Sequence, residues 1–260
     1  MGHKTLIDGV GYDITGGRCL VDGVGYSIQK GRTMVDGVGY DVAFDNEFTS
    51  ENIEVGSSVY TSVNGVRTEF LVVHQGLPSS MYDASCDGTW LLMKDIYVKR
   101  AWHSSNSNSY KASTINTYLN DTFYNLFSSN TKNKIKTVKI PYVNGTGNGA
   151  VASGVNGLSV DVFLLAAREV GFTDSYAPVD GACLSYFNGA SSAKRVARYN
   201  GSADHWRLRS PMKGTTDSVY LVQNGGGSGS DGAKWSYGIR PAFILDSSAA
   251  IDPDTFDILG

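Results

Sequence analysis

The chain has 260 residues, of which 41% are hydrophobic and 18% are charged, and its formal net charge is −3. This composition is typical of a globular protein, and the length allows one substantial core with a smaller module beside it. The weakly negative charge argues against a nucleic-acid partner, and no run approaches the roughly 18 apolar residues of a membrane-spanning helix, so we expect no membrane insertion.

The chain begins with a sequence repeat. Asp-Gly-Val-Gly-Tyr occurs three times, in units that start at Thr5, Cys19 and Thr33, a spacing of 14 residues. Asp-Gly is a strong signal for a two-residue hairpin turn, because glycine accepts positive φ. Each unit is therefore predicted to be about one β-hairpin, with a second turn at Gly16 and Gly17 in the first unit and at Lys30 and Gly31 in the second.

So short and glycine-rich a unit cannot bury a core alone. Two interpretations remain open: a small sheet packed on the main domain, or a β-prism shared by symmetry-related chains. We expect residues 1–45 to be an all-β module for attachment or oligomerisation. Through residues 5–42 it is expected to contact other copies of the chain, most favourably as a trimer, or other proteins of an assembly.

The polar segment 43–52 marks a boundary, after which one larger domain is expected over residues 46–260. Strands are predicted at 53–60, 67–74 and 88–93, with Asn64 and Gly65 forming the turn of a hairpin. A helix is predicted over 113–128, because Ile115, Leu119, Phe123 and Phe127 recur on one face and Ser113 is a suitable N-cap.

The rest of the domain alternates short strands with long loops. Strands are predicted at 135–140, 160–165, 218–222 and 237–245, helical turns at 166–170, and glycine-rich loops at 144–157 and 224–232. Mixed short strands with one longer helix favour an α+β domain. Its core is expected to contain Ile115, Leu119, Phe123, Phe127, Leu164, Trp206 and Phe243.

Four segments together resemble one family. They read YKASTINTYLNDTFYNLF (110–127), VFLLAAREVG (162–171), HWRLRSP (205–211) and YGIRPAFIL (237–245). In this order they resemble a domain family of unknown function that is common in gut-bacterial genomes and their prophages, over roughly residues 53–246. The ending is similar to that of C-type-lectin-like domains of the formylglycine-generating-enzyme type, and the repeat is similar to those that begin some phage tail proteins.

These resemblances imply a C-type-lectin-like α+β domain behind the repeat module. They also imply a phage tail-associated protein (fibre, tip or baseplate) that binds a receptor or glycan on the host-cell surface. Met-Gly-His-Lys-Thr leads into the repeat without the apolar stretch of a signal peptide, so we expect the chain to be made in the host bacterial cytoplasm and to end in the virion tail. Two alternatives remain open: a purely structural virion component that binds other virion proteins, and a glycan-cleaving tail enzyme.

Catalytic and metal-binding patterns are sparse. Cys19, Cys86 and Cys183 match no zinc spacing and are interpreted as reduced thiols, and the four histidines are scattered. We therefore expect no metal and no cofactor. No Gly-x-Ser-x-Gly motif is present, so we expect no enzyme, although two carboxylates at a suitable separation are all that a glycosidase needs.

The arginines of the two C-terminal motifs have two possible roles. Arg207, Arg209 and Arg240 either bind an anion or glycan, or are buried and fork to carboxylates and carbonyls. The second role is favoured, because residues typical of a core, such as Trp206 and Leu208, alternate with them.

Ligand binding is expected from residues 184–237, which are rich in tyrosine, asparagine, serine and glycine. These residues suit adaptable recognition loops held by a rigid frame. The glycine-rich loop 224–232 lacks the Lys-Ser/Thr of a phosphate loop and is interpreted as a hairpin tip. The rings of Trp235 and Tyr237 either stack on a ligand or pack on the core. The candidate ligand-binding residues are Tyr186, Asn188, Tyr199, Asn224, Trp235 and Tyr237.

Overall fold

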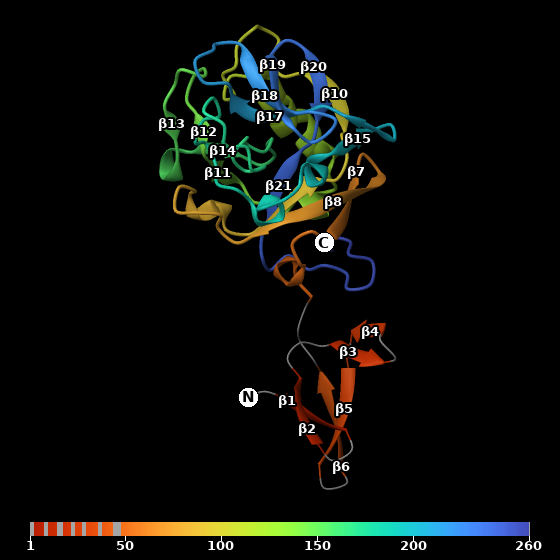
Figure 1. Ribbon diagram of the computed structural model, residues 1–260. Helices are drawn as coiled ribbons and strands as arrows, with labels where there is room; N and C mark the ends of the chain where they lie inside the picture. Colours follow the sequence, from red (N-terminus) through yellow and green to blue (C-terminus); the bar gives the residue numbers. More distant parts are fainter. Residues whose placement is uncertain are drawn as a thin grey trace. The chain divides into compact units, whose positions relative to one another are not determined.

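The computed structural model describes residues 48–259 in full and, before them, the backbone of strands at 3–7, 10–14, 18–21, 24–27, 30–35 and 38–43 (Figure 1). The chain divides into two compact units, Met1–Phe48 and Thr49–Gly260. Each unit is considered by itself.

The first unit contains three antiparallel hairpins. β1 (His3–Ile7) pairs with β2 (Val10–Ile14), β3 (Arg18–Val21) with β4 (Val24–Ser27), and β5 (Lys30–Val35) with β6 (Val38–Ala43). Each repeat unit is thus one hairpin, as predicted, and its strands are separated by the two residues Asp-Gly, which lie outside the described residues. Among the described strands of this unit, each hairpin is its own two-stranded sheet.

The second turn of the middle repeat differs from the prediction. Lys30 pairs with Ala43 and Gly31 with Val42, so both residues extend β5 instead of forming a turn. The longer ladder gives both backbones hydrogen-bond partners, and this outweighs the local turn preference of glycine. Gly16 and Gly17 lie outside the described residues.

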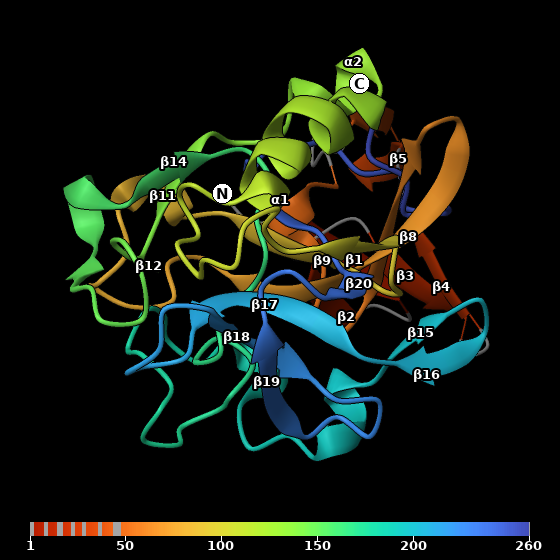
Figure 2. The same cartoon turned by 90° about the horizontal axis from the view of Figure 1, so that it is seen from above.

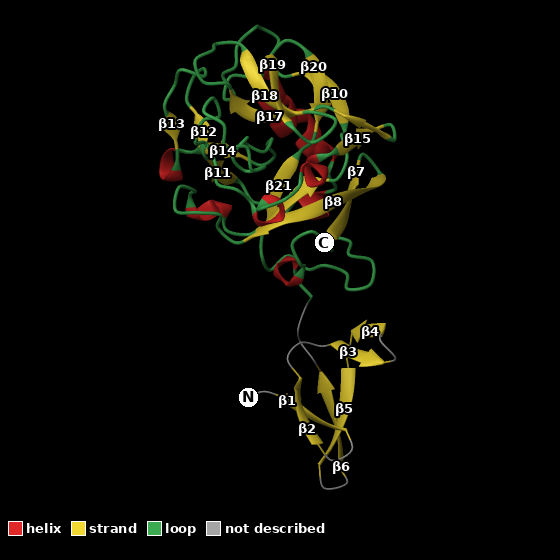
Figure 3. Ribbon diagram, viewed as in Figure 1, coloured by secondary structure: helices red, strands yellow, loops and turns green. Residues whose placement is uncertain are grey.

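The second unit is mixed and rich in β-structure. Helices make up 16% of the structure and strands 34% (Figure 3). One sheet has the antiparallel order β21-β9-β8-β7, built from β7 (Ser58–Val63), β8 (Val66–Gln75), β9 (Thr89–Met93) and β21 (Ala242–Leu245). The predicted turn is confirmed, since Asn64 and Gly65 have φ of 51° and 78°, as a two-residue hairpin turn requires.

The other large sheet has the order β10-β20-β17-β18-β19. Its strands are β10 (Val98–Ala101), β17 (Trp206–Pro211), β18 (Ser218–Val222), β19 (Ser228–Gly232) and β20 (Ser236–Ile239). β17 and β20 run parallel, and the other neighbours are antiparallel. In Figure 1, this sheet lies at the end of the domain away from β7 and β8.

Two predicted segments near the C-terminus are corrected. The loop expected at 224–232 ends early, because residues 228–232 pair with β18 as β19. The strand expected at 237–245 is two strands in two different sheets, β20 and β21. Pro241 lies between them and has no N–H to continue a ladder, while its carbonyl accepts from Met93 N at 2.9 Å. The chain therefore crosses from one sheet to the other at Arg240 and Pro241.

The predicted helix is present but irregular. Residues 114–126 form one helical run made of α1 (Thr114–Thr117), a π-helical turn η3 (Tyr118–Phe123) and a 3₁₀ turn η4 (Tyr124–Leu126) (Figure 2). Ser113 Oγ caps it by accepting from Asn116 N at 3.1 Å. The run stops before residue 128 because Phe127 is extended and Ser128 caps the next helix, α2 (Ser129–Lys132).

Shorter elements complete the domain. Three small two-stranded antiparallel sheets pair β11 (Val138–Ile140) with β14 (Leu158–Val160), β12 (Tyr142–Val143) with β13 (Val151–Ala152), and β15 (Ala197–Tyr199) with β16 (Ser202–Asp204). The 3₁₀ turns are η1 (Ser50–Asn52), η2 (Ala84–Cys86), η5 (Gly154–Asn156), η6 (Ser185–Phe187) and η7 (Ser192–Arg195).

Several other boundaries differ from the prediction. In place of the strands expected at 53–60, 135–140 and 160–165, the structure has β7 at 58–63, β11 at 138–140 and β14 at 158–160, so β7 and β14 are shifted along the chain. The helical turn expected at 166–170 is present, with Val170 N donating to Ala166 O at 3.3 Å. Alternation and apolarity located these segments but not their ends.

The predicted core is confirmed. All seven expected residues are at most 3% exposed, namely Ile115, Leu119, Phe123, Phe127, Leu164, Trp206 and Phe243. The ring of Phe127 joins the helical run to the first sheet, since its centroid lies 5.3 Å from that of Phe123 and 5.1 Å from that of Phe243. No helix in the described part of the chain is both long and apolar enough to cross a membrane.

Candidate functional site

Trp235 is distinguished by its exposure. The chain has four tryptophans; Trp90, Trp102 and Trp206 are 0% exposed, whereas Trp235 is 56% exposed. It lies in the short connection from β19 to β20, where its main-chain N–H donates to Gly232 O at 3.1 Å. The sequence left open whether this ring is exposed or packs on the core, and the structure shows it exposed.

Arg207 holds the backbone of this turn from the interior of the domain. The side chain is 0% exposed, and its Nη2 donates to Gly232 O at 2.6 Å and to Trp235 O at 3.3 Å. Nη1 donates to Val219 O at 3.1 Å and to Asp231 O at 3.0 Å. Three of the four acceptors belong to residues 231–235. The planar fork of arginine thus sets the backbone that carries the exposed indole.

Ala233 ties the same turn to its neighbours. Its N–H donates to Asp217 O at 2.8 Å, and its carbonyl accepts from Trp102 N at 2.9 Å and His103 N at 3.0 Å. The segments that contain Asp217 and Asn106 are therefore held beside the turn. Asn106 Nδ2 donates to Asp217 Oδ2 at 3.0 Å, which fixes both side chains.

The indole of Trp235 lies close to Gly232. A Cβ at Gly232 would lie 3.2 Å from Trp235 Cδ1, 3.4 Å from Trp235 Nε1 and 3.5 Å from Asn106 Oδ1. The indole and the amide of Asn106 therefore rest on the same side of Gly232. Lys234 Nζ lies 5.5 Å from the ring centroid of Trp235. We call Trp235, Lys234, Gly232, Asn106 and Asp217 the indole platform.

Tyr237, by contrast, is part of the support. It is half-buried, its hydroxyl donates to Asp231 Oδ2 at 2.5 Å, and Arg207 Cζ lies 4.6 Å from its ring centroid. The hydrogen bond raises the pKa of Tyr237 and lowers that of Asp231. Arg207 covers one face of the Tyr237 ring. Tyr237 therefore supports the turn from within, whereas the Trp235 ring is exposed to solvent.

Tyr199 lies at the same edge of the five-stranded sheet. Lys99 Nζ, on the edge strand β10, lies 5.3 Å from the ring centroid of Tyr199 and is paired with Asp204. Asp204 Oδ1 lies 3.7 Å from His205 Nδ1, and the ring of His205 is 5.9 Å from that of Tyr237. These contacts link Tyr199 to Tyr237 indirectly, through Lys99, Asp204 and His205.

The remaining candidates gather around η7. Lys194 Nζ lies 4.8 Å from the ring centroid of Tyr186 and donates to its carbonyl at 3.3 Å. Arg195 Nε donates to Gly226 O at 2.8 Å, which holds the loop that follows Asn224. Asn188 and Asn224 are both exposed. Among the six candidates, Tyr199 is thus linked indirectly to Tyr237, which lies two residues after Trp235, whereas Tyr186 and the loop after Asn224 contact η7 and Asn188 follows η6.

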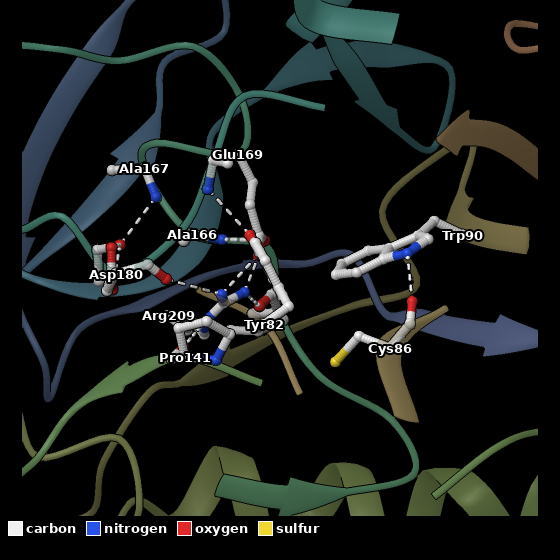
Figure 4. A network of polar contacts seen from close by, with 12 residues as sticks. Tyr82, Cys86, Trp90, Pro141, Ala166, Ala167, Glu169, Asp180 and Arg209 are labelled. Carbon is white, nitrogen blue, oxygen red and sulfur yellow. Dashed lines mark hydrogen bonds and ion pairs between the residues drawn. The ribbon is translucent and has the colours of Figure 1, made fainter. Parts of the chain in front are cut away.

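A buried ion pair lies in the interior of the domain. Arg209 Nη1 and Nη2 donate to the two carboxylate oxygens of Glu169, each at 2.6 Å, and both side chains are 0% exposed (Figure 4). Tyr82 Oη donates to Glu169 Oε1 at 2.7 Å, and Ala166 N donates to Oε2 at 2.8 Å. Arg209 also donates to Pro141 O, Leu164 O and Asp180 O, each at 3.0 Å. Every acceptor of this carboxylate is therefore used inside the fold.

The network positions residues 180–187. Ala182 N donates to Tyr82 Oη at 3.0 Å, and Leu184 N donates to Glu169 O at 3.0 Å. The buried Asp180 carboxylate accepts from Ser210 Oγ at 2.8 and 2.9 Å, and burial raises its pKa to about 6. The sequence analysis missed Glu169, although a glutamate inside the apolar run VFLLAAREVG is the signal of a buried acid that needs a cation.

The third motif arginine also lies inside the fold. Arg240 is 1% exposed, its Nε donates to Met93 O at 2.6 Å, and its Cζ lies 4.8 Å from the ring centroid of Trp206. It holds the crossing between β20 and β21. Arg207, Arg209 and Arg240 therefore act as buried supports, which answers the question that their motifs left open. Arg207 Nε and Arg240 Nη1 have no hydrogen-bond partner among the described residues.

Metal-ligand clusters and thiols can be followed within the described residues. No group of three or more His, Cys, Asp or Glu residues within them is arranged to hold a metal ion. Cys86 is buried and Cys183 exposed, both as free thiols, and burial raises the pKa of Cys86 to about 12. Cys19 lies outside the described residues.

Comparison with known proteins gives one family match. Residues 87–247 match the model of a family described as "Domain of unknown function (DUF6273)". No curated protein and no solved structure matches the chain. The matched region contains the indole platform, Arg207 and the Glu169–Arg209 pair, whereas the repeat lies before it.

Proposed function

The chain belongs to the DUF6273 family, a domain family of unknown function, and from the surfaces of this member we propose that it is a phage tail-associated protein that binds a receptor or glycan on the host-cell surface. The observation that carries the proposal is the exposed indole of Trp235 on a turn held by Arg207. A fibre, tip or baseplate protein of the virion tail is the context that the N-terminal repeat suggests.

The energetics of the turn support a binding role. Tryptophan is the largest apolar side chain, and leaving 56% of it in water gives up burial energy that Trp90, Trp102 and Trp206 gain. Three hydrogen bonds from Arg207 fix the backbone of the turn, so a partner would meet a rigid surface and little entropy would be lost on binding. Exposed aromatic side chains on rigid supports are typical of binding hot spots.

The repeat module supports assembly. An isolated two-stranded hairpin is marginally stable in water, and its outer edges leave backbone groups unpaired. Three such hairpins, each its own sheet among the described strands, therefore need further contacts. We propose that residues 5–42 supply these contacts between copies of the chain, as a homo-oligomer and most favourably a trimer, or to other tail proteins.

The fold proposal follows the same reasoning. Two sheets joined at Arg240 and Pro241, one short helical run and long loops are compatible with a C-type-lectin-like domain, whose loops carry variable binding residues on a fixed frame. An experimental structure compared with such domains tests this. The proposal concerns architecture alone, since fold does not fix function.

The structural alternative, in which the chain binds only other virion proteins, would cover exposed apolar side chains such as Leu77, Val155 and Val179, which are 40%, 74% and 55% exposed. A glycan-cleaving activity gains no such support, because the buried carboxylates of Glu169 and Asp180 are occupied by Arg209 and Ser210.

Adsorption tests the proposal. The purified full chain is incubated with a panel of gut-bacterial strains, and the bound fraction is measured after washing. Binding to at least one strain that saturates with concentration is the expected result. If no strain is bound, while removing the chain from a phage particle prevents tail assembly, the structural alternative replaces receptor binding.

A further inference from the structure

We propose that the indole platform binds an uncharged pyranose ring of a surface glycan. This inference rests on the proposed function and names its ligand class and its contact residues. The platform supplies an aromatic face, a polar rim and a balanced charge, and each feature excludes a different class of partner.

The aromatic face selects for a flat apolar surface. One face of a pyranose ring presents axial C–H groups, which pack on an indole as other apolar groups do, and the positive C–H edges meet the negative π face. Trp235 is the tryptophan available for this contact, since Trp90, Trp102 and Trp206 are 0% exposed. The indole lies close to Gly232, and Arg207 donates to the main-chain oxygen of Trp235, which fixes the backbone that carries the ring.

The polar rim suits vicinal hydroxyls. Asn106 and Asp217 lie side by side, joined by one hydrogen bond of 3.0 Å from Nδ2 to Oδ2. An amide has two N–H donors and an acceptor oxygen, and a carboxylate has several acceptor positions, so both keep capacity after this bond. Asn106 Oδ1 lies on the same side of Gly232 as Trp235 Nε1. A hydroxyl both donates and accepts, and this mixed rim offers both complements.

The charges around the platform favour a neutral sugar. Lys234 Nζ lies over the indole, 5.5 Å from its ring centroid, and Asp217 is the carboxylate on the rim. Below them, the buried charge of Arg207 is balanced by Asp231, whose pKa is lowered first by the Tyr237 hydroxyl and further by Arg207. These four formal charges sum to zero, two positive and two negative. A sugar carboxylate or sulfate finds no net attraction and meets Asp217 at the rim.

A single open platform implies weak affinity. One stacked ring with two hydrogen-bonding side chains predicts a Kd on the order of 1 mM. An assembly through residues 5–42 multiplies such sites on one particle, and avidity then gives firm attachment. The sugar site and the repeat module thereby serve one purpose.

Tryptophan fluorescence tests the site directly, because acrylamide reaches Trp235 and not the three buried indoles. The full chain is titrated with neutral maltohexaose, cellohexaose and mannohexaose and with anionic hexagalacturonate, in 5 mM steps. At least one neutral sugar is expected to reduce acrylamide quenching twofold or more, and hexagalacturonate is expected to have no effect. Protection by the anionic sugar alone, or by none of the four, overturns the proposal.

Variants locate the contact by saturation-transfer NMR, which does not depend on the fluorophore. Trp235→Ala is expected to lose sugar binding tenfold or more, and Asn106→Ala about threefold or more. Tyr176→Ala is the matched control, because Tyr176 is also 56% exposed and lies outside the platform. Its binding should stay unchanged. Unchanged binding by Trp235→Ala, with the wild-type melting temperature, overturns the site.

The same variant in the adsorption assay separates this inference from the proposed function. Loss of adsorption by Trp235→Ala, and by wild-type chain on cells oxidised with periodate, supports a glycan. Loss with the variant but not with periodate means that the platform binds a protein and overturns the sugar. Undiminished adsorption of the variant overturns the platform while receptor binding stands. Neutral-sugar binding at Trp235 without adsorption to any strain supports the platform and refutes receptor binding.

Discussion

The buried guanidinium of Arg207 donates a hydrogen bond of 3.3 Å to the main-chain oxygen of the exposed Trp235. A side chain with no solvent contact therefore sets the position of the tryptophan that meets solvent. The relationship connects the motif HWRLRSP, which resembles scaffold in the sequence, to the neighbouring residues that we propose for recognition.

Replacing Arg207 by lysine is expected to destabilise the domain by about 2–4 kcal/mol. Lysine keeps a charge but cannot reach four carbonyls with one ammonium group, and buried acceptors without donors cost about 1–3 kcal/mol each. Urea unfolding measures the loss, and acrylamide quenching of Trp235 should increase because the turn becomes mobile. A variant with wild-type stability and wild-type quenching would show that the turn keeps its conformation without the hydrogen bonds of Arg207.

Trp235→Ala and Tyr237→Phe should differ in stability. The exposed indole contributes little to the fold, so its removal should change the free energy of unfolding by less than about 0.5 kcal/mol. Tyr237→Phe removes the hydrogen bond to Asp231 and should cost about 0.5–1.5 kcal/mol. Thermal or urea unfolding compares them. The assignment is reversed if the Trp235 variant is the less stable of the two.

Phe123→Ala is expected to cost about 3–5 kcal/mol, because its fully buried ring packs on Phe127 and Tyr97 and truncation leaves a cavity. Equilibrium unfolding in urea provides the value. A loss below about 1 kcal/mol would mean that the helical run 114–126 does not pack against the first sheet through Phe123. Tyr124→Ala, one residue along on the half-buried side, is the matched control and should have a smaller effect.

Asp180 predicts a specific dependence of stability on pH. Its pKa is about 6 in the fold, chiefly through burial, against an ordinary value of 3.8. Between these values the folded chain holds a proton that the unfolded chain has released, so this group's contribution to stability falls as pH rises from about 4 to 6 and is constant above. Asp180→Asn should remove that slope while its amide oxygen still accepts from Ser210.

The measurement is the difference in unfolding free energy between wild type and Asp180→Asn at several pH values from 4 to 7. The variant should gain on the wild type by up to about 3 kcal/mol across this interval, which is the linkage equivalent of the shift. Other titrating groups cancel in the difference. A difference independent of pH would place the Asp180 pKa at its ordinary value in the fold.

The sequence predicted the parts of this fold that local patterns control. Asp-Gly and Asn-Gly located hairpins, and spacing of three and four residues located the helical face of Ile115, Leu119 and Phe123. It failed where distant partners decide. The segment Ser-Gly-Ser-Asp-Gly favours a loop locally, but it forms β19 because it pairs with β18. The break at Pro241 depends on β20 and β21 belonging to two different sheets.

The candidate site divides in the same way. Composition directed attention to Trp235, but whether its ring faces water depends on how β19 and β20 end. Asn106 and Asp217 join the platform from segments more than 100 residues apart, and the chain gives no local signal for that contact. The role of Arg207 was expected in kind, whereas its acceptors in the turn required the structure.

Deleting residues 1–45 should convert an oligomer into a monomer. Hairpins that are separate two-stranded sheets are only marginally stable alone, so we expect them to gain their stability between chains, and the remainder retains both large sheets and its own core. Light scattering of the full chain and of residues 46–260 gives both masses, and urea unfolding shows whether the shorter chain keeps its fold. The shorter chain should bind neutral sugar with unchanged affinity per site but adsorb to cells at least tenfold more weakly, because avidity is lost. Equal monomeric masses for the two chains, together with equal incorporation into particles, would contradict an assembly role for the repeat.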